Sequence, residues 1–204
     1  MTQPGKVRHI LIPNQKGNPS DIQEPGRELG SKDKDMIHFF IDDDNIKPAE
    51  LQTKYEKCLE EMELHRIVCP CCGRAGHLIR YGCYSRSIRI LCERVLLTIQ
   101  RVLCKHCGKT HALLPDLIVP YSQIPLEDQR DAILCPEEVM ERNDLIDESE
   151  IYRLRRNFRK VWKQRLLSAG IRMDGALTLD CFRHFRMQFM QIRRGCCGLF
   201  ASPT

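Results

Sequence analysis

The chain has 204 residues, 42% of them hydrophobic but only 6% aromatic, and it carries a formal net charge of +5. The small aromatic share argues against one large core and favours several small modules. No apolar run is long enough to span a bilayer, and the first residues lack the apolar segment of a signal peptide, so we expect an intracellular protein without membrane contact. In that setting, the 12 cysteines favour metal binding and free thiols over disulfides.

The charge is divided into blocks along the chain. Residues 66–111 contain nine Lys and Arg residues against one acid, and residues 153–194 contain twelve against two. Residues 112–152 have the opposite balance, with two basic residues and eleven acids. A dense cationic surface repels itself unless a polyanion neutralises it, so the two basic blocks point to nucleic acid phosphate as a partner.

The N-terminal part of the chain divides into two segments. Residues 1–35 are polar and rich in Gly and Pro, so we expect this segment to be disordered. In residues 36–65, an initial apolar run indicates a strand, and Pro48 suits the first position of a helix. Apolar residues then recur at helical spacing from Leu51 to Met62, which predicts an amphipathic helix that packs on the next module.

Residues 66–115 contain two Cys-x-x-Cys-Gly turns, or knuckles. The cysteine pairs are Cys69 with Cys72 and Cys104 with Cys107, separated by 31 residues. Two residues between paired cysteines aim both sulfurs at one ion, and the Gly that follows permits a positive φ. Four thiolates at this spacing predict one structural, tetrahedrally bound Zn²⁺ in a zinc ribbon.

Other assignments of these sulfurs remain open from the sequence. Cys71 lies inside the first pair, but only Cys69 with Cys72 repeats the pattern of the second knuckle. His106 and His111 are alternative ligands, although a loop residue and a strand-end residue are simpler interpretations. The cysteines are also compatible with reduced buried clusters or with a redox dithiol, but a redox pair needs no second matched copy.

Between the knuckles, the sequence predicts three strands, over residues 77–81, 86–91 and 94–103, the last with alternating apolar and polar residues. They would form a three-stranded antiparallel zinc ribbon, which is too small to be stable without its metal. Four arginines of these strands are candidate phosphate contacts, with solubility as the alternative role. They are Arg80, Arg86, Arg89 and Arg101.

Residues 116–170 change to a helical pattern. Pro125 and Pro136 each open a helix, and acidic residues follow in the first turn of both. Three apolar residues of the first helix are expected to face inward: Leu126, Ile133 and Leu134. After a short turn, Asp147 caps a long third helix that Gly170 terminates. A short second helix and a long third one are the outline of a helix-turn-helix.

The long third helix carries an apolar face and a basic face. Like charges at i and i+4 disfavour the isolated helix by roughly 0.2–0.5 kcal/mol per pair, and a phosphate backbone would reverse that effect. Asn157 and Gln164 are candidates to read base edges, or are exposed amides without a base partner. The candidate phosphate contacts on this helix are Arg153, Arg156, Lys160 and Lys163. A solvated basic helix is the alternative interpretation.

Residues 171–204 are expected to contain a linker, a basic helix and an uncharged tail. Thr178 is the predicted cap of this helix, which extends to about Arg194. Its apolar side comprises Leu179, Phe182, Phe185, Phe189 and Ile192. The arginines on this helix would extend the basic surface of the protein.

The first knuckle, followed by residues 101–115, resembles the zinc ribbon at the N-terminus of bacterial insertion-sequence transposases. Residues 119–122 and 138–167 resemble a transposase-associated domain family of unknown function, and the likeness covers about residues 36–204. The resemblance implies that the four cysteines bind zinc and that the ribbon and helix-turn-helix bind the inverted repeats at the element ends.

In such transposases, a catalytic domain with three carboxylates and two Mg²⁺ ions follows the DNA-binding region. Beyond Glu150, this sequence has Asp174 and Asp180 as its acids, and no length for that domain remains. The resemblance therefore implies DNA binding without catalysis.

We therefore expect an α+β fold, with a small antiparallel zinc ribbon, a helix-turn-helix three-helix unit and a C-terminal helix. The expected function is zinc-dependent binding of double-stranded DNA by a non-enzymatic protein of a mobile element, in the bacterial cytoplasm with the nucleoid. A separate transposase catalytic subunit is a candidate partner, and the sequence leaves the oligomeric state open. Two alternatives are a transcriptional regulator with the same modules and a zinc-ribbon adaptor for protein or RNA.

Overall fold

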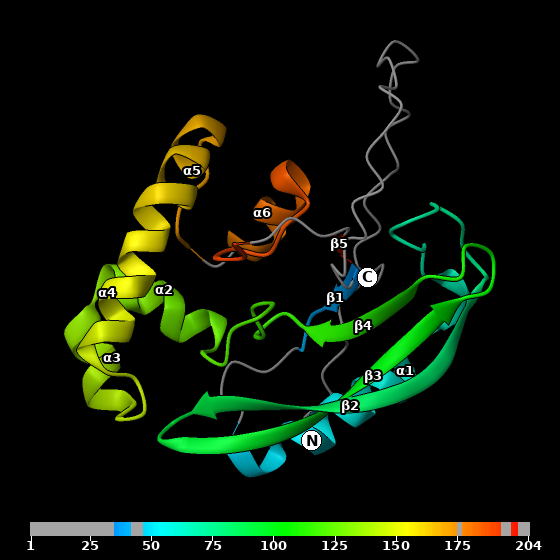
Figure 1. The fold of residues 1–204 in the computed structure, drawn as a ribbon, viewed down its shortest axis with the longest axis horizontal. Helices are drawn as coiled ribbons and strands as arrows, with labels where there is room; N and C mark the ends of the chain where they lie inside the picture. Colours follow the sequence, from blue (N-terminus) through cyan, green and yellow to red (C-terminus); the bar gives the residue numbers. More distant parts are fainter. Residues whose placement is uncertain (1–34, 42–46, 175–176, 193–196, 200–204) are drawn as a thin grey trace, which may run out of the picture.

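A computed structural model of the chain describes residues 35–41, 47–174, 177–192 and 197–199. The segment expected to be disordered, residues 1–35, lies outside these ranges apart from its last residue. The fold is α+β, as predicted, with a mixed sheet at one end of the molecule and a group of helices at the other (Figure 1).

The sheet has the strand order β2-β3-β4-β1-β5. Strands β2, β3 and β4 are antiparallel, whereas β1 pairs in parallel with both β4 and β5. The strands are β1 (Asp35–Phe39), β2 (Leu78–Ile90), β3 (Glu93–Cys104), β4 (Thr110–Pro115) and β5 (Cys197–Leu199). The strand predicted near the start of residues 36–65 is confirmed, and it joins the same sheet as the cysteine-bearing strand β3.

The prediction of separate strands at 77–81 and 86–91 is wrong, and the third antiparallel strand beside the knuckles is β4. Both segments belong to the single strand β2, which pairs with β3 along its length. The register shifts between Arg80 and Gly82, where a β-bulge absorbs an extra residue. Gly82 has a φ of +117°, a conformation that side chains disfavour, so this glycine permits the bulge without ending the strand.

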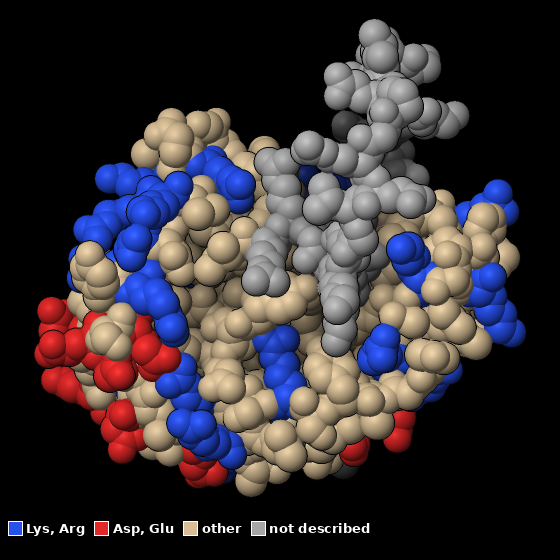
Figure 2. Space-filling model, in the orientation of Figure 1, with Lys and Arg blue, Asp and Glu red and all other residues tan. Residues whose placement is uncertain are grey.

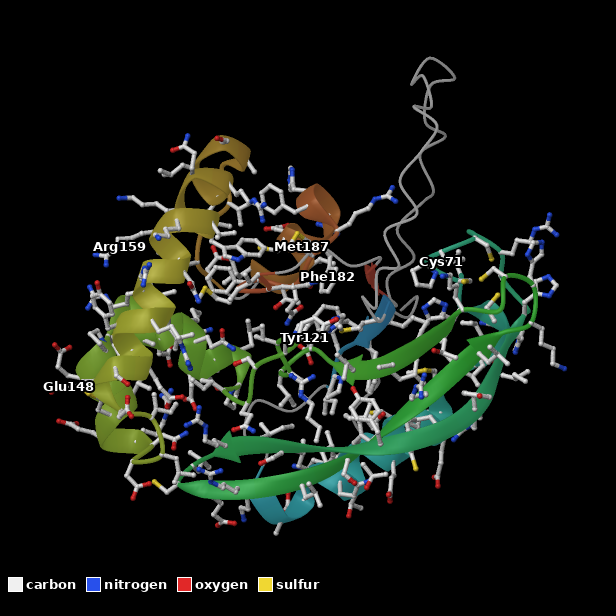
Figure 3. All side chains as sticks on the ribbon, in the orientation of Figure 1. Cys71, Tyr121, Glu148, Arg159, Phe182 and Met187 are labelled. Carbon is white, nitrogen blue, oxygen red and sulfur yellow. The ribbon has the colours of Figure 1, made fainter. Side chains whose placement is uncertain are left out.

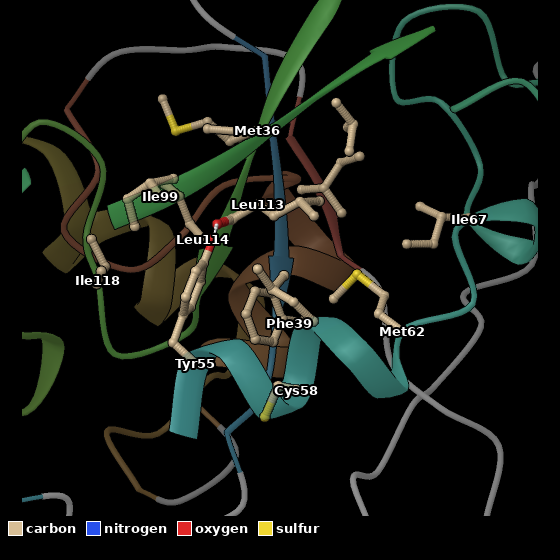
Figure 4. Packing of buried hydrophobic residues seen from close by; sticks show 14 of the residues in the cluster. Met36, Phe39, Tyr55, Cys58, Met62, Ile67, Ile99, Leu113, Leu114 and Ile118 are labelled. Carbon is tan, nitrogen blue, oxygen red and sulfur yellow. Dashed lines mark hydrogen bonds between the residues drawn. The ribbon is translucent and has the colours of Figure 1, made fainter. Parts of the chain in front are cut away.

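Helix α1 (Leu51–Glu61) packs on the sheet, as its apolar spacing predicts. The short helix η1 (Pro48–Glu50) precedes it, and Pro48 occupies the first position. The hydroxyl of Tyr55 donates to the carbonyl of Leu113 at 2.9 Å (Figure 4). It also accepts the backbone N–H of Gln100 at 2.8 Å. These two bonds fix α1 to β3 and β4 beneath the buried apolar residues of the sheet.

Strand β1 is buried on both faces. The ring of Phe39 lies 5.7 Å from that of Tyr55 in α1, whereas the ring of His38 lies 5.0 Å from that of Phe182 in α6 (Leu177–Phe185). Because side chains alternate along a strand, α1 and α6 cover opposite faces of the sheet at this point. A strand covered on both faces has a nearly continuous apolar sequence, which is the pattern seen at residues 36–39.

The helical part of the chain surrounds a second apolar cluster, separate from that of the sheet. Its first elements are α2 (Leu126–Leu134), α3 (Pro136–Arg142), α4 (Glu148–Asn157), the π-helical turn η3 (Phe158–Trp162) and α5 (Lys163–Ala169). The last three form one composite helix. Asp147 accepts the backbone N–H of Glu150 at 2.8 Å, and Gly170 has a φ of +65°, so both predicted ends of this helix are confirmed.

The inward-facing residues of α2 are predicted in part: Leu126 and Ile133 pack against the second apolar cluster. Leu134, expected to face inward, is 53% exposed. The residues of α2 that are buried are Asp128, Gln129 and Ala132, because two polar side chains of this helix bond to neighbouring loops and helices. The spacing of apolar residues alone could not predict that polar residues of this helix are buried through hydrogen bonds.

The C-terminal helix is shorter than predicted. Helix α6 ends at Phe185 instead of near Arg194, because Arg186 has a φ of +52°, which a right-handed helix cannot continue. Thr178 is buried inside α6, so it is not the predicted cap. The predicted apolar side extends past the helix end, and Ile192 is 59% exposed. Among the described residues, no helix has the length and apolar character to cross a bilayer.

Candidate metal centre and cationic helix

The two knuckles have matching backbone geometry. The carbonyl of Cys69 accepts the N–H of Gly73 at 2.9 Å, and the carbonyl of Cys104 accepts the N–H of Gly108 at 2.8 Å. The φ angles of Gly73 and Gly108 are +69° and +70°. Both turns therefore use glycine for a left-handed conformation, as their sequences predict.

The four predicted ligands lie together. The Sγ atoms of Cys69, Cys72, Cys104 and Cys107 are all within 4.8 Å of one another. The distances from Cys69 to Cys107 and from Cys72 to Cys104 are both 3.7 Å. In a regular tetrahedron with edges of that length, the centre lies about 2.3 Å from each corner, which is the length of a Zn–S bond. The four thiols can therefore hold one metal ion.

The environments of the two fully buried thiols of this cluster shift their pKa values in opposite directions. Burial raises the pKa of the Cys69 thiol, and nearby backbone N–H groups oppose this only in part. Burial acts in the same direction on Cys104, but hydrogen bonds from the N–H groups of Cys107 and His106 and from neighbouring thiols together outweigh it and lower the pKa of the Cys104 thiol. Because metals bind thiolates, loading this cluster must release protons, and its metal affinity must fall at low pH.

The three alternative ligands occupy different positions. Cys71 is exposed and lies outside the sulfur cluster. His106 is exposed, and its ring lies 5.6 Å from that of His77. His111 is fully buried in β4, and its Nε2 lies 3.3 Å from the Sγ of Cys69. The imidazole of His111 is therefore in contact with a predicted ligand.

Two of the predicted ribbon arginines lie at the surface near the cysteine cluster. Arg80 is exposed and donates to the carbonyl of Leu59 at 2.8 Å. Arg101 donates to the hydroxyl of Thr110 at 2.8 Å, and its guanidinium lies 5.8 Å from the centre of the exposed Tyr81 ring. Both side chains are oriented by the protein while remaining accessible to solvent.

The other two ribbon arginines hold parts of the protein together. Arg86 donates to the carbonyls of Val119 and Ser122 at 2.7 and 2.6 Å, and burial lowers its pKa. Arg89 donates two hydrogen bonds to the carboxylate of Glu150, at 2.7 and 2.6 Å. Since Arg86 is half-buried and Arg89 is buried against these acceptors, we leave both out of the candidate phosphate surface.

The Arg89–Glu150 pair joins the end of the β2–β3 hairpin to the first turn of α4. The two side chains are only 11% and 16% exposed. Arg89 also donates to the carbonyl of Leu145 at 2.6 Å, in the turn before α4. Bidentate pairs between arginine and carboxylate are strong and geometrically specific. The sequence gives no signal for this pair, because its members are 61 residues apart.

Further polar contacts fix the turn between α3 and α4. The buried Asn143 donates to the carboxylate of Asp128 at 3.1 Å and accepts the backbone N–H of Leu145 at 3.2 Å. Arg142 donates to Asp128 at 2.6 Å and to Asp131 at 3.0 Å. These bonds connect α2, α3 and the turn. Asn143 also donates to the backbone carbonyl of Arg89 at 3.4 Å, so the start of α4 has a defined position relative to the hairpin.

The exposed side of the composite helix is strongly basic. The exposed basic residues, which we call the cationic ridge, are Arg153, Arg155, Arg156, Arg159, Lys160 and Lys163. Figure 2 shows Lys and Arg atoms gathered over this helix. Figure 3 places Cys71, in the first knuckle, and Arg159, in the ridge, at opposite ends of the molecule. The β2–β3 hairpin runs between these two ends (Figure 1).

Acidic residues border the ridge at the start of the composite helix. Glu137 and Glu138 lie in the first turn of α3, and Glu148 lies in the first turn of α4. Figure 2 shows Asp and Glu atoms beside the basic ones in this region. A polyanion would therefore meet the composite helix from Arg153 onward and avoid its first turn.

The two candidate base-reading amides have different exposures. Asn157 is half-buried, whereas Gln164 is exposed and donates to the hydroxyl of Ser168 at 3.3 Å. Between them, the π-helical turn η3 brings Trp162 into the second apolar cluster, where its indole N–H donates to the carbonyl of Gln191 at 3.2 Å. The composite helix is thus anchored in its middle, and its polar side remains outward.

Comparison with known proteins gives one family match. Residues 69–154 match a family described as a domain of unknown function (DUF6431). The matched region starts at the first candidate ligand and ends in α4, so it includes the four-cysteine cluster and the start of the composite helix. No curated protein and no solved structure matches the chain.

Proposed function

We propose that this chain is a zinc-dependent, non-enzymatic protein that binds double-stranded DNA. The observation that carries the proposal is the cationic ridge, six exposed basic residues on one rigid helix. Repulsion between neighbouring charges on such a helix is relieved when phosphates neutralise them. The anchoring of the helix through Arg89 and Trp162 keeps the ridge in one orientation, as a DNA contact surface requires.

We infer that α2, α3 and α4 act as a helix-turn-helix, with the composite helix as the recognition element. The short α3 and the four-residue turn before Asp147 support this role, as do the buried contacts of Asn143 in that turn. Arg153, Arg156, Lys160 and Lys163 would contact phosphates, while Asn157 and Gln164 would lie near base edges. Arg80 and Arg101 provide a second cationic area near the metal centre.

The proposed ion is one structural Zn²⁺ held by Cys69, Cys72, Cys104 and Cys107. Four thiolates fit the tetrahedral, sulfur-rich coordination that zinc prefers, and a closed set of four ligands leaves no position for a substrate. The ion would hold the two knuckles together at one end of the sheet. We therefore assign it a role in folding and not in catalysis.

The mobile-element context of this proposal rests on the resemblance to transposase zinc ribbons. A chain with these modules would recognise the ends of an element, as an accessory protein or together with a separate catalytic subunit. The fold supports DNA binding equally for a transcriptional regulator, and binding sites recovered from genomic DNA would separate these two roles.

The first test is the salt dependence of binding to a 30-base-pair duplex. If six to ten phosphates are contacted, affinity should fall about 10³- to 10⁵-fold between 50 and 200 mM salt. The double variant Arg156→Gln/Lys160→Gln should bind more weakly and reduce the salt slope by about two units, since each lost phosphate contact removes about 0.9. Fluorescence anisotropy at several salt concentrations measures both quantities.

A matched control removes two charges outside the composite helix, with the double variant Lys57→Gln/Arg66→Gln on and after α1. Both residues are exposed, and this variant should keep the wild-type salt slope. Equal effects of the two double variants would show that net charge, not the ridge, determines binding. Structured RNA that competes as well as duplex DNA would favour the adaptor function instead.

A further inference from the structure

One buried histidine lies against the metal centre. His111 is on β4, between the second knuckle and the apolar core, and its side chain is fully buried. Its Nε2 lies 3.3 Å from the Sγ of Cys69, which is also fully buried. A nitrogen at this distance is within hydrogen-bond reach of a sulfur, so the contact is polar and specific.

A four-thiolate zinc site carries excess negative charge, because four thiolates exceed the charge of one Zn²⁺ by two. In water the solvent would screen this excess, but Cys69 and Cys104 are fully buried. N–H groups that donate to its sulfurs stabilise such a site. Backbone N–H groups in the two knuckles supply part of this requirement, at Cys69, Cys104 and Cys107.

We propose that His111 is a positioning residue of the metal centre, which donates its Nε2–H to the Cys69 thiolate without being a ligand. The inference rests on the proposed metal binding and deepens it. The hydrogen bond withdraws charge from one of the two fully buried sulfurs and fixes its orientation toward the ion. The four sulfurs already supply a closed tetrahedral set, so the imidazole has no coordination position to fill.

The substitutions that test this role keep or remove the donor. His111→Gln places an amide N–H near the former Nε2, whereas His111→Phe fills the same space without a donor. The control is His38→Phe, because His38 is also a fully buried histidine of the same sheet and contacts Phe182 instead of a cysteine. All three variants are made in the full chain.

Zinc affinity, measured by competition with a chromophoric chelator, should fall about 10- to 100-fold in His111→Phe, the range seen when outer-shell partners of metal ligands are removed. His111→Gln should recover most of the affinity, and His38→Phe should keep the wild-type value. Equal zinc affinities of His111→Phe and His38→Phe would overturn the inference while leaving the metal centre in place.

Cobalt substitution separates a donor from a ligand. The thiolate-to-cobalt charge-transfer intensity per bound Co²⁺ should be the same in the wild-type protein and both His111 variants, since the four sulfurs remain the ligands. A coordination spectrum that changes in His111→Phe would make His111 a ligand and overturn the inference. A wild-type protein that binds neither Zn²⁺ nor Co²⁺ would instead remove the metal centre on which the inference rests.

Nuclear magnetic resonance of the wild-type protein gives a test that needs no substitution. In the zinc-loaded protein, Nε2 of the His111 imidazole should carry a proton. A deprotonated, metal-shifted Nε2 resonance would contradict the proposal, because a metal-bound nitrogen cannot carry that proton.

Discussion

The substitution Cys104→Ser is expected to abolish stoichiometric zinc binding and to disorder the sheet end that carries the knuckles. Cys104 is fully buried at the last position of β3, and its carbonyl closes the second knuckle. Structural zinc contributes on the order of 10 kcal/mol in small domains that fold around it. Zinc content by atomic absorption and thermal unfolding by circular dichroism, each with and without chelator, measure the effect.

The control for this prediction is Cys71→Ser, inside the same knuckle. Cys71 is exposed and lies outside the sulfur cluster, so its substitution should keep one zinc per chain and change stability by no more than about 0.5 kcal/mol. Loss of zinc in Cys71→Ser, with retention in Cys69→Ser, would show that the first knuckle uses a different pair of cysteines.

Unfolding in the presence of chelator tests whether the two apolar clusters depend equally on the metal. The cysteines belong to the cluster of the sheet and α1, whereas Trp162 lies in the cluster of the helical part. Metal removal should therefore change the spectroscopic signal of Tyr55, which lies between α1 and the sheet, more than it changes the fluorescence of Trp162. A simultaneous loss of both signals would mean that the Arg89 contacts couple the two clusters into one folding unit.

The parts of this protein that could be predicted from its sequence are those encoded locally. The knuckles follow from residue spacing and the two glycines, because the geometry of such a turn depends on neighbouring residues. The ends of the composite helix follow from Asp147 and Gly170 for the same reason. Each of these signals lies within four residues of the structure it specifies.

The features that could not be predicted depend on contacts between distant segments. Parallel pairing places β1 beside β4, far along the chain, and no local pattern specifies that neighbour. Gly82 suggests a break between two strands, but its positive φ serves a bulge within β2. The positive φ of Arg186 ends α6 although the apolar spacing continues. The sequence does not predict this end, because a positive φ is uncommon at residues other than glycine.

Counting charges could not distinguish the roles of the arginines. Arg86 and Arg89 belong to the same basic block as Arg80 and Arg101. However, Arg86 and Arg89 donate to carbonyls and a carboxylate of segments that pack against the hairpin. A sequence shows the number of cations in a segment. Only the packing shows which of them already have a protein partner.

Substitution of Arg89 by Ala is expected to destabilise the protein by about 3–5 kcal/mol, the cost of breaking one side of a buried ion pair. The change leaves the Glu150 carboxylate, only 16% exposed, with the exposed Arg153 at 3.2 Å as its remaining basic neighbour. It also removes the donor to the Leu145 carbonyl. Urea unfolding, followed by Trp162 fluorescence, gives the free energy of unfolding.

The control is Arg94→Ala, directly across the hairpin from Arg89 in the β2–β3 register. Arg94 is exposed, so its loss should cost less than about 0.5 kcal/mol. The double variant Arg89→Ala/Glu150→Ala should be more stable than the sum of its single variants, because it leaves no uncompensated buried charge. Equal costs for Arg89→Ala and Arg94→Ala would mean that the hairpin does not position the composite helix.

Metal content and DNA affinity of the same variants extend this test to function. Arg89 lies at the end of the hairpin away from the knuckles, so Arg89→Ala should retain one zinc per chain. Its duplex affinity should nevertheless fall, although Arg89 makes no proposed phosphate contact, because the cationic ridge loses its fixed orientation. Glu150→Ala removes an acid, so simple electrostatics would strengthen its binding to DNA. Loss of the fixed position of the composite helix would instead weaken binding. The sign of the change in the duplex affinity of Glu150→Ala therefore distinguishes the two causes.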